Sequence, residues 1–139
     1  MILYADTSSL AKLYLLEEGS VEMRELVVAV PQVTTSQVAY AETRVALARA
    51  FRERRLDEAG FGRVRQKFEG EWPSFGGIKL SEEILQEAGN LGDMHPIRGF
   101  DAIHLASAKQ VRVQSSDDVM FSTADRRLRD AAIAERFVV

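Results

Sequence analysis

Short apolar runs with the composition of strands alternate along this chain with longer segments of helical periodicity. Strands are predicted at residues 2–5, 32–35, 77–80 and 119–122, with 136–139 as a candidate for a last one. Helices are predicted at residues 8–17, 20–29, 36–48, 57–71, 81–91, 100–108 and 126–134. Because a helix between two strands usually returns the chain to a parallel neighbour, this order predicts an α/β domain with a mainly parallel sheet.

Length and composition fit one domain spanning residues 1–139. Of the 139 residues, 46% are hydrophobic and 28% charged, which is ordinary for a globular chain with a real core. The absence of cysteine excludes a disulfide framework and a thiolate zinc site, and suits a cytoplasmic protein. We expect no membrane association, since no secretory leader precedes the first strand and no apolar run is long enough to cross a bilayer.

Four acidic residues lie where an open α/β sheet usually has its ligand-binding or catalytic residues. Asp6 and Asp125 each follow a predicted strand. Asp101 begins a predicted helix, and Glu42 lies in the first turns of another. The carboxyl ends of parallel strands gather along one edge of the sheet, so we expect all four carboxylates to converge there. Glu42 also lies beside the apolar stripe of its helix, where a carboxylate is costly to bury without a positive partner.

Ordinary structural roles compete with this interpretation. Asp6 and Asp101 each lie where a side-chain oxygen would cap the following helix. His104 is three residues after Asp101, on the same helical face, and is more simply a buried structural histidine than a general base. No Ser or Cys nucleophile motif accompanies it. Only the convergence of several acids would favour a functional site over isolated caps.

Four carboxylates in one place require a counter-charge. At short range they raise one another's pKa values until some of them are protonated. A hard divalent cation bound between them would neutralise this repulsion between like charges. Oxygen ligands without Cys or paired His favour Mg²⁺, with Mn²⁺ as a substitute, over zinc. Such a site performs metal-assisted phosphodiester hydrolysis. Ser8 and Thr123 are then left with two open roles, to hydrogen-bond a ligating carboxylate or to bind phosphate.

Basic residues are concentrated in one part of an acidic chain. The formal charge of −3 argues against a generally basic nucleic-acid binder. Between Glu42 and Glu69, however, eight Lys or Arg residues face five acids, a local balance of +3. The two helices that carry them are expected to form an antiparallel hairpin whose basic stripe could meet phosphates. A solvated helical face of mixed charge is the alternative.

Four short motifs contain one of these acids each. They are residues 4–14 (YADTSSLAKLY), 41–42 (AE), 98–106 (RGFDAIHLA) and 122–128 (STADRRL). In this order, they resemble the PIN-domain ribonucleases and, within them, the VapC-type toxins of toxin–antitoxin pairs. The resemblance covers essentially the whole chain. It implies a Rossmann-like, three-layer α/β/α sandwich with a metal-dependent endoribonuclease site.

The resemblance also assigns roles to individual residues. Asp6, Glu42, Asp101 and Asp125 would take the family's acidic positions as catalytic residues, with Asp6 and Asp101 most directly tied to Mg²⁺. These positions are all acidic here, so the resemblance implies an active nuclease.

Two further residues take substrate-binding roles on the same basis. Thr123 matches the hydroxyl residue that accompanies the last acid, and Arg98 lies where it would touch substrate phosphate or form a surface salt bridge. The basic hairpin would hold the RNA backbone. The family further implies a homodimer and a small VapB-like antitoxin that covers the active-site groove.

Other functions remain open at this point. One is a non-catalytic RNA- or protein-binding module on the same fold, and another is a nuclease with an RNA-processing role outside toxin–antitoxin systems. A phosphotransfer enzyme using Asp6 as nucleophile is disfavoured, because a dehalogenase-type phosphatase would place an Asp at position 8, which is Ser.

Overall fold

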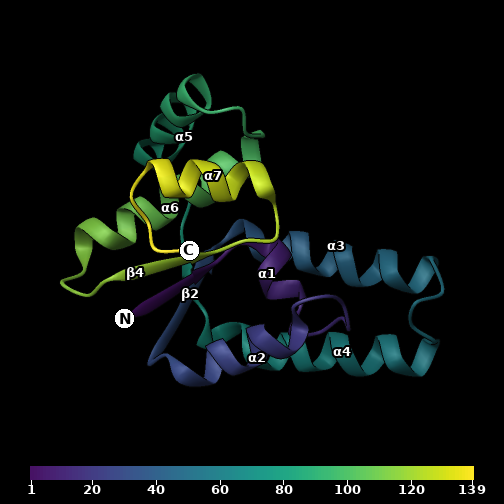
Figure 1. The fold of residues 1–139 in the computed structure, drawn as a ribbon. Helices are drawn as coiled ribbons and strands as arrows, with labels where there is room; N and C mark the ends of the chain where they lie inside the picture. Colours follow the sequence, from purple (N-terminus) through teal and green to yellow (C-terminus); the bar gives the residue numbers. More distant parts are fainter.

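The computed structural model describes residues 1–139 and consists of a parallel sheet with helices on both faces (Figure 1). The strands are β1 (Ile2–Ala5), β2 (Gln32–Ser36), β3 (Gly76–Ile78) and β4 (Val119–Ser122), in the order β3-β2-β1-β4. The helices are α1 (Thr7–Ala11), α2 (Ser20–Ala29), α3 (Val38–Arg52), α4 (Glu58–Glu71), the 3₁₀ helix η1 (Trp72–Ser74), α5 (Glu82–Met94), α6 (Gly99–Gln114) and α7 (Arg126–Ala134). This architecture confirms the predicted α/β sandwich.

The register of the central strands brings two predicted site segments together. β1 pairs in parallel with β2 on one side and with β4 on the other, and Ala5 lies opposite Ser122. The backbone N–H of Asp6 continues this pairing by donating to the carbonyl of Ser122 at 3.1 Å. The loops after β1 and β4 therefore leave the sheet side by side, which places Asp6 next to Thr123.

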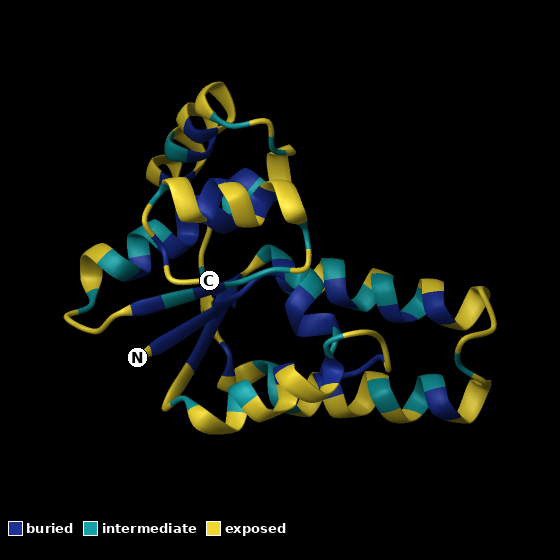
Figure 2. Ribbon diagram, in the orientation of Figure 1, coloured by how far each residue is buried: buried dark blue, intermediate teal, exposed yellow.

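Two hydrophobic cores fill the space between the three layers. On one face of the sheet, α5, α6 and α7 pack around Tyr4, Leu105 and Phe121. On the other face, α1 to α4 pack around Leu3, Leu47 and other apolar side chains. β1, most of β2 and the inner sides of the helices are buried, while the outer helical faces are exposed (Figure 2). All four residues of β1 are buried, as expected for a central strand covered on both faces.

Helices α3 and α4 form an antiparallel hairpin that extends away from the sheet, as predicted (Figure 1). Asp57 caps α4 by accepting a hydrogen bond from the N–H of Gly60 at 2.6 Å. Near the tip, the rings of Phe51 and Phe61 stack with their centroids 4.9 Å apart. Phe68 is fully buried at the base of the hairpin, so the hairpin is anchored in the core while its tip is largely exposed.

The predicted helix at residues 8–17 is confirmed at its start, by α1, but is wrong beyond Ala11. α1 ends at Ala11, and turns then lead to Gly19, which has a φ of +87° and precedes α2. Leu13, Tyr14 and Leu15 are all buried although they lie in turns and a bend, so their apolar character reflects burial in the core and not a continued helix. Ser20 is the first residue of α2, in agreement with the predicted helix at 20–29, and its hydroxyl donates to the carbonyl of Leu15.

Other boundaries differ from the predictions by a few residues. Ser36 ends β2 rather than opening a helix, and α6 continues to Gln114 rather than stopping near residue 108. The candidate strand at 136–139 is reduced to one parallel bridge between Val138 and Met120. β3 covers residues 76–78 and α5 covers residues 82–94, close to their predicted ranges.

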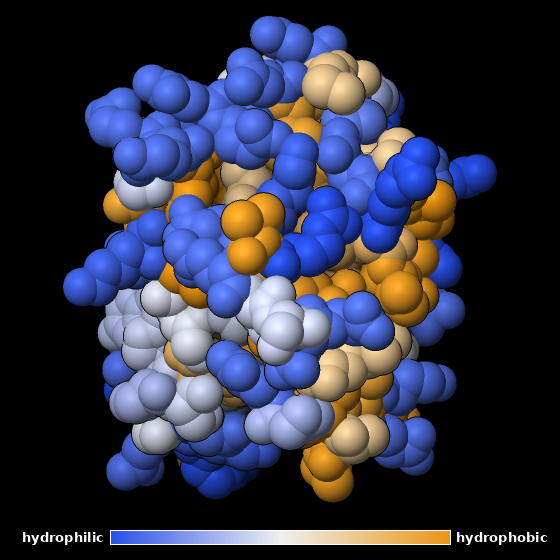
Figure 3. All heavy atoms as spheres, turned by 90° about the vertical axis from the view of Figure 1, so that its left-hand side faces the viewer, coloured by the Kyte–Doolittle hydropathy of each residue, from blue (hydrophilic) through white to orange (hydrophobic).

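The outer surface is mostly polar. On the side turned toward the viewer in Figure 3, hydrophilic residues cover most of the face and hydrophobic ones lie between them in small groups. Single exposed apolar residues such as Val28 and Val113 are normal on a folded domain. None of the helices combines the length and apolar character that spanning a membrane requires.

Candidate active site

Asp6 is buried at the start of the loop after β1, with only 3% of its surface exposed. Its Oδ1 atom caps α1 by accepting from the backbone N–H of Ser9 at 2.9 Å, and also accepts from the hydroxyl of Ser8 at 2.7 Å. Its Oδ2 atom accepts from the hydroxyl of Thr123 at 2.5 Å. Burial raises the pKa of Asp6, and these hydrogen bonds offset only part of that effect.

Glu42 reaches the same site from the first turns of α3. Its Oε1 atom accepts from the hydroxyl of Thr7 at 2.6 Å and from Nε2 of His104 at 2.9 Å. Burial pushes the pKa of Glu42 upward, but the hydrogen bonds from His104 and Thr7 outweigh it, so its pKa lies below the ordinary value. Glu42 is therefore ionised at neutral pH.

His104 connects this carboxylate to the core. Its side chain is 2% exposed, and its Nδ1 atom lies 2.9 Å from the hydroxyl of Tyr4. The Glu42 carboxylate can only accept, so Nε2 carries a proton; in the neutral ring Nδ1 then accepts from Tyr4. The burial predicted for His104 is confirmed, and the hydrogen-bond partner of the Glu42 carboxylate is a histidine N–H rather than an arginine.

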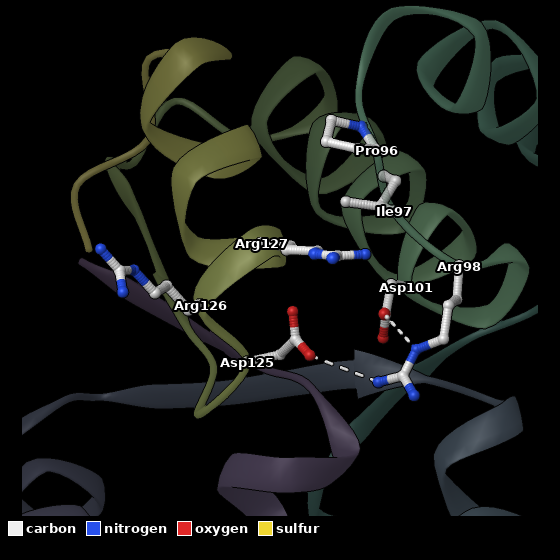
Figure 4. Close-up of a pocket in the computed structure, with 7 residues that line it drawn as sticks. All are labelled: Pro96, Ile97, Arg98, Asp101, Asp125, Arg126 and Arg127. Carbon is white, nitrogen blue, oxygen red and sulfur yellow. Dashed lines mark hydrogen bonds and ion pairs between the residues drawn. The ribbon is translucent and has the colours of Figure 1, made fainter.

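Asp101 and Asp125 share one arginine. The guanidinium of Arg98 donates from Nε to Asp101 Oδ2 and from Nη2 to Asp125 Oδ2, at 3.3 Å each (Figure 4). The Arg98 side chain is 81% exposed, so this bridge lies in solvent. Asp125 also caps α7, because its Oδ1 accepts from the N–H of Leu128 at 2.8 Å. The cap expected at Asp101 is wrong, since Arg98 occupies the cap position of α6 and Asp101 lies in the first turn.

Thr123 links two of the acids. Its hydroxyl donates to Asp6 Oδ2 and accepts from the backbone N–H of Asp125 at 3.0 Å. The hydroxyl of Ser8 donates to Asp6 Oδ1 and accepts from the N–H of Ala124 at 2.9 Å. Both hydroxyls thus hydrogen-bond a carboxylate and tie the loop after β1 to the loop after β4.

All four predicted acids line one cavity of about 400 Å³ at the carboxyl edge of the sheet. Its wall also contains the hydroxyls of Thr7 and Ser8, the guanidinium of Arg98 and the imidazole of His104. No three His, Asp or Glu side chains are arranged as a metal-binding group. The donor set nevertheless fits a hard divalent cation, because carboxylate oxygens dominate it and the charge of Asp6 is buried without an ion-pair partner.

Comparison with known proteins identifies the family. The profile of the PIN domain matches residues 3–134. The chain belongs to the PIN domain family. Among curated proteins it is similar to Ribonuclease VapC45 and Ribonuclease VapC49 of two strains of Mycobacterium tuberculosis, with 34% identity over 133 residues, covering 96% of this chain and 90% of each relative. These relatives support the predicted VapC type within the PIN family.

Two solved structures share the PIN fold. One is FitAcB from Neisseria gonorrhoeae, with a TM-score of 0.71, 19% identity, and coverage of 96% of this chain and 94% of that chain. The other is a toxin–antitoxin complex from Klebsiella pneumoniae, with a TM-score of 0.70, 19% identity, and coverage of 100% and 96%. At this identity the likeness concerns the fold alone.

Half of the eight basic residues in the PIN domain's helical hairpin form ion pairs. Arg44 pairs with Glu69 at 2.5 Å, and Arg49 pairs with Glu53 at 2.9 Å. Lys67–Glu71 and Arg55–Glu17 are further ion pairs, at 3.8 and 3.6 Å. The paired residues fit the alternative of a solvated face with mixed charges, whereas Arg52, Arg54, Arg63 and Arg65 are exposed and take part in no ion pair.

Sequence reasoning missed several groups around the site. Thr7 lies directly after the predicted Asp6, yet its bond to Glu42 joins residues 35 positions apart and has no local signal. Arg126 and Arg127 line a cavity together with Arg98, Asp101 and Asp125 (Figure 4). Their position directly after Asp125 in the motif was visible in the sequence and could have drawn attention to them.

Proposed function

We propose that this PIN domain is a Mg²⁺-dependent endoribonuclease and acts as a VapC-like toxin. The observation that carries the proposal is the single cavity lined by Asp6, Glu42, Asp101 and Asp125 at the carboxyl edge of the sheet. A phosphodiester is the substrate class that such a carboxylate set serves through a hard cation. The names of the curated relatives, both ribonucleases, support RNA as the substrate.

In this proposal Asp6 and Asp101 hold the cation. Bound Mg²⁺ polarises a phosphoryl oxygen and makes a bound water more acidic. Thr123 and Ser8 fix the orientation of the Asp6 carboxylate from the side. Their bonds leave Asp6 little freedom to turn, so the carboxylate is preorganised for its ligand.

Glu42 and Asp125 complete the acidic set in different ways. Glu42 is ionised and held by Thr7 and His104, so it accepts a hydrogen bond from the attacking water and orients it. Asp125 is fixed by its cap at the start of α7 and closes the opposite side of the cavity. Arg98 is exposed and held by two long contacts, which lets a substrate phosphate recruit its guanidinium.

The partners follow from the same assignment. We propose an antitoxin of the VapB kind that covers the cavity, and a homodimer as the active form. The solved toxin–antitoxin complex that shares this fold supports a partner protein of this class. Copurification with the product of a neighbouring small gene, followed by loss of nuclease activity, tests the toxin assignment separately from the nuclease assignment.

The deciding experiment measures cleavage of single-stranded RNA with and without Mg²⁺. Wild-type protein should cut RNA in Mg²⁺ and stop in EDTA, and Asp6→Asn or Asp101→Asn should lower the rate by at least about a thousandfold. Asp93→Asn, an exposed acid of α5, is the matched control and should cleave normally. Wild-type activity in both site variants would rule out the assigned centre.

A non-catalytic binding module is the second candidate function. It is favoured by the bridge from Arg98 to Asp101 and Asp125, which already supplies their counter-charge, and by the lack of a three-residue metal group. Calorimetric titration with Mn²⁺ separates the two, because the nuclease requires saturable binding that Asp6→Asn removes. RNA binding without saturable cation binding would establish the second candidate.

A further inference from the structure

We propose that Arg126, Arg127 and Arg129 of α7 hold the RNA backbone on the two sides of the acidic cavity, in place of the α3–α4 hairpin. The ligand class rests on the proposed function. The inference adds which surface binds the phosphates next to the scissile bond. It differs from the expectation drawn from charge along the sequence, which pointed to residues 42–69.

The first observation is that these arginines are free. Arg126, Arg127 and Arg129 are exposed and take part in no ion pair. Free guanidinium groups are ready to bind phosphate without first breaking an internal contact. In the hairpin, by contrast, Arg44 and Arg49 are held by glutamates at 2.5 and 2.9 Å. The unpaired hairpin arginines line neither the acidic cavity nor the cavities beside it; they are Arg52, Arg54, Arg63 and Arg65.

The second observation is that the arginines line cavities that share wall residues with the acidic one. Arg127 and Arg126 line a cavity of about 420 Å³ that also contains Asp101 and Asp125. Arg126 and Arg129 line another, of about 870 Å³, which shares Asp125 with the first. Asp125 also lines the acidic cavity, so these three hollows meet at the start of α7.

The helical spacing directs the arginines to different sides. Arg126 and Arg129 are three residues apart and lie on one face of α7, toward the cavity that contains Lys12. Arg127 lies on a different face, and Figure 4 shows its guanidinium reaching across the pocket above Asp125, toward Pro96 and Ile97, while Arg126 points the other way. A chain that passes over Asp125 thus meets an arginine before and after it.

This arrangement fits a polyphosphate chain. A nucleic acid strand presents a phosphate at every nucleotide, so cations on both sides of the cleavage point place the scissile bond over the acids. The same cations also offset the repulsion between the carboxylates and RNA. An acidic protein segment is the competing ligand, and the experiment includes it as a separate probe.

The test measures binding by fluorescence anisotropy in EDTA, where no Mg²⁺-dependent cleavage intervenes. The probe is a labelled single-stranded RNA of about twelve nucleotides, a length that spans a typical single-strand site. Arg126→Gln/Arg127→Gln should weaken binding at least about tenfold at low salt and make the slope of log affinity against log salt about 1.4 shallower. Arg126→Lys/Arg127→Lys should keep most of the slope, since it keeps the charge.

The matched control is Arg52→Gln/Arg63→Gln. It removes the same charge from two exposed hairpin arginines that also lack ion pairs, and it should leave the slope unchanged. An unchanged slope in the α7 variant, or an equal loss in the hairpin control, would overturn the proposal. Tighter binding of a labelled polyglutamate peptide than of RNA would also overturn the proposal, provided that the α7 substitutions abolish the binding of the peptide.

The outcome is independent of whether the protein cleaves RNA. If wild type binds RNA through α7 but does not cut it in Mg²⁺, the proposed function fails and this inference stands. If wild type cuts RNA and the α7 variant binds and cuts normally, the inference fails and the proposed function stands.

Discussion

Replacing His104 with alanine tests the link between the core and the candidate site. The side chain is 2% exposed and contacts both the Tyr4 hydroxyl and the Glu42 carboxylate at 2.9 Å. Losing a hydrogen bond to a charged group costs about 1.5–3 kcal/mol, and leaving the buried Tyr4 hydroxyl unpaired costs about 1–3 kcal/mol. The contributions overlap, and a partly relaxed cavity adds to them. We expect His104→Ala to lower the free energy of unfolding by about 4 kcal/mol.

Urea unfolding followed by circular dichroism measures this change directly. For a domain of this size, the same loss should lower Tm by roughly 12–16 °C. Tyr4→Phe removes one partner only and should cost about 1–2 kcal/mol. In the double variant the two losses should not add, because both substitutions remove the same hydrogen bond.

The other histidine is the natural control. His95 contacts Glu135 at 2.9 Å but is more exposed than His104, with 14% of its side chain accessible. His95→Ala should therefore cost about 1 kcal/mol. A His104→Ala loss no larger than that of His95→Ala would refute the claim that the buried bonds to Tyr4 and Glu42 stabilise this edge of the sheet.

Three further predictions concern the acids. Burial raises the pKa of Asp6 in the folded state above its value in the unfolded chain. The stability that this group contributes is therefore present below the unfolded-state pKa and is lost as the pH rises through the folded-state pKa. Asp6→Asn should raise Tm at pH 7, and this gain in Tm should shrink on acidification. The hydrogen bonds of Glu42 lower its pKa in the folded state, so the stability that it contributes is lost as the pH falls through the folded-state pKa. Glu42→Gln should therefore lower the free energy of unfolding by about 1–2 kcal/mol at pH 7 and by little at acid pH, as measured by urea unfolding. Arg98→Gln frees Asp101 and Asp125 and should tighten Mn²⁺ binding about fivefold by calorimetry, whereas weaker binding would contradict a competing role for the guanidinium.

The sequence predicted the layers of this fold because the periodicity of apolar residues reports directly on burial. β1, β2 and β4 are apolar or β-branched runs, and the helices between them carry one apolar face each. The failures concern helix ends, where local signals compete with packing. At residues 12–17 the sequence keeps an apolar pattern typical of a helix although the helix has already ended. The reason is that Leu13, Tyr14 and Leu15 are buried in the same core without being helical. No glycine or proline interrupts residues 109–114, so the longer α6 was consistent with the sequence.

The candidate site was predictable only in its acids. A carboxylate directly after a parallel strand lies at the carboxyl edge of the sheet, so the positions of Asp6 and Asp125 could be predicted. What each acid contacts depends on side chains far away in the chain. His104 meets Glu42 across 62 positions, and Arg98 meets Asp125 across 27. Nor could charge along the sequence show that Arg44 and Arg49 of the hairpin would pair with glutamates while the arginines of α7 take part in no ion pair.

In Asp6 and Asp125 one carboxylate oxygen caps a helix while the other oxygen contacts side chains of the site. In both residues Oδ1 accepts a backbone N–H of the following helix, from Ser9 and Leu128 respectively. In both, Oδ2 faces other side chains, Thr123 in one case and Arg98 in the other. The cap therefore fixes the carboxylate while its second oxygen is directed elsewhere. A strand end followed at once by a helix start supplies both conditions, which is why the two loops after β1 and β4 bring rigid carboxylates to one cavity.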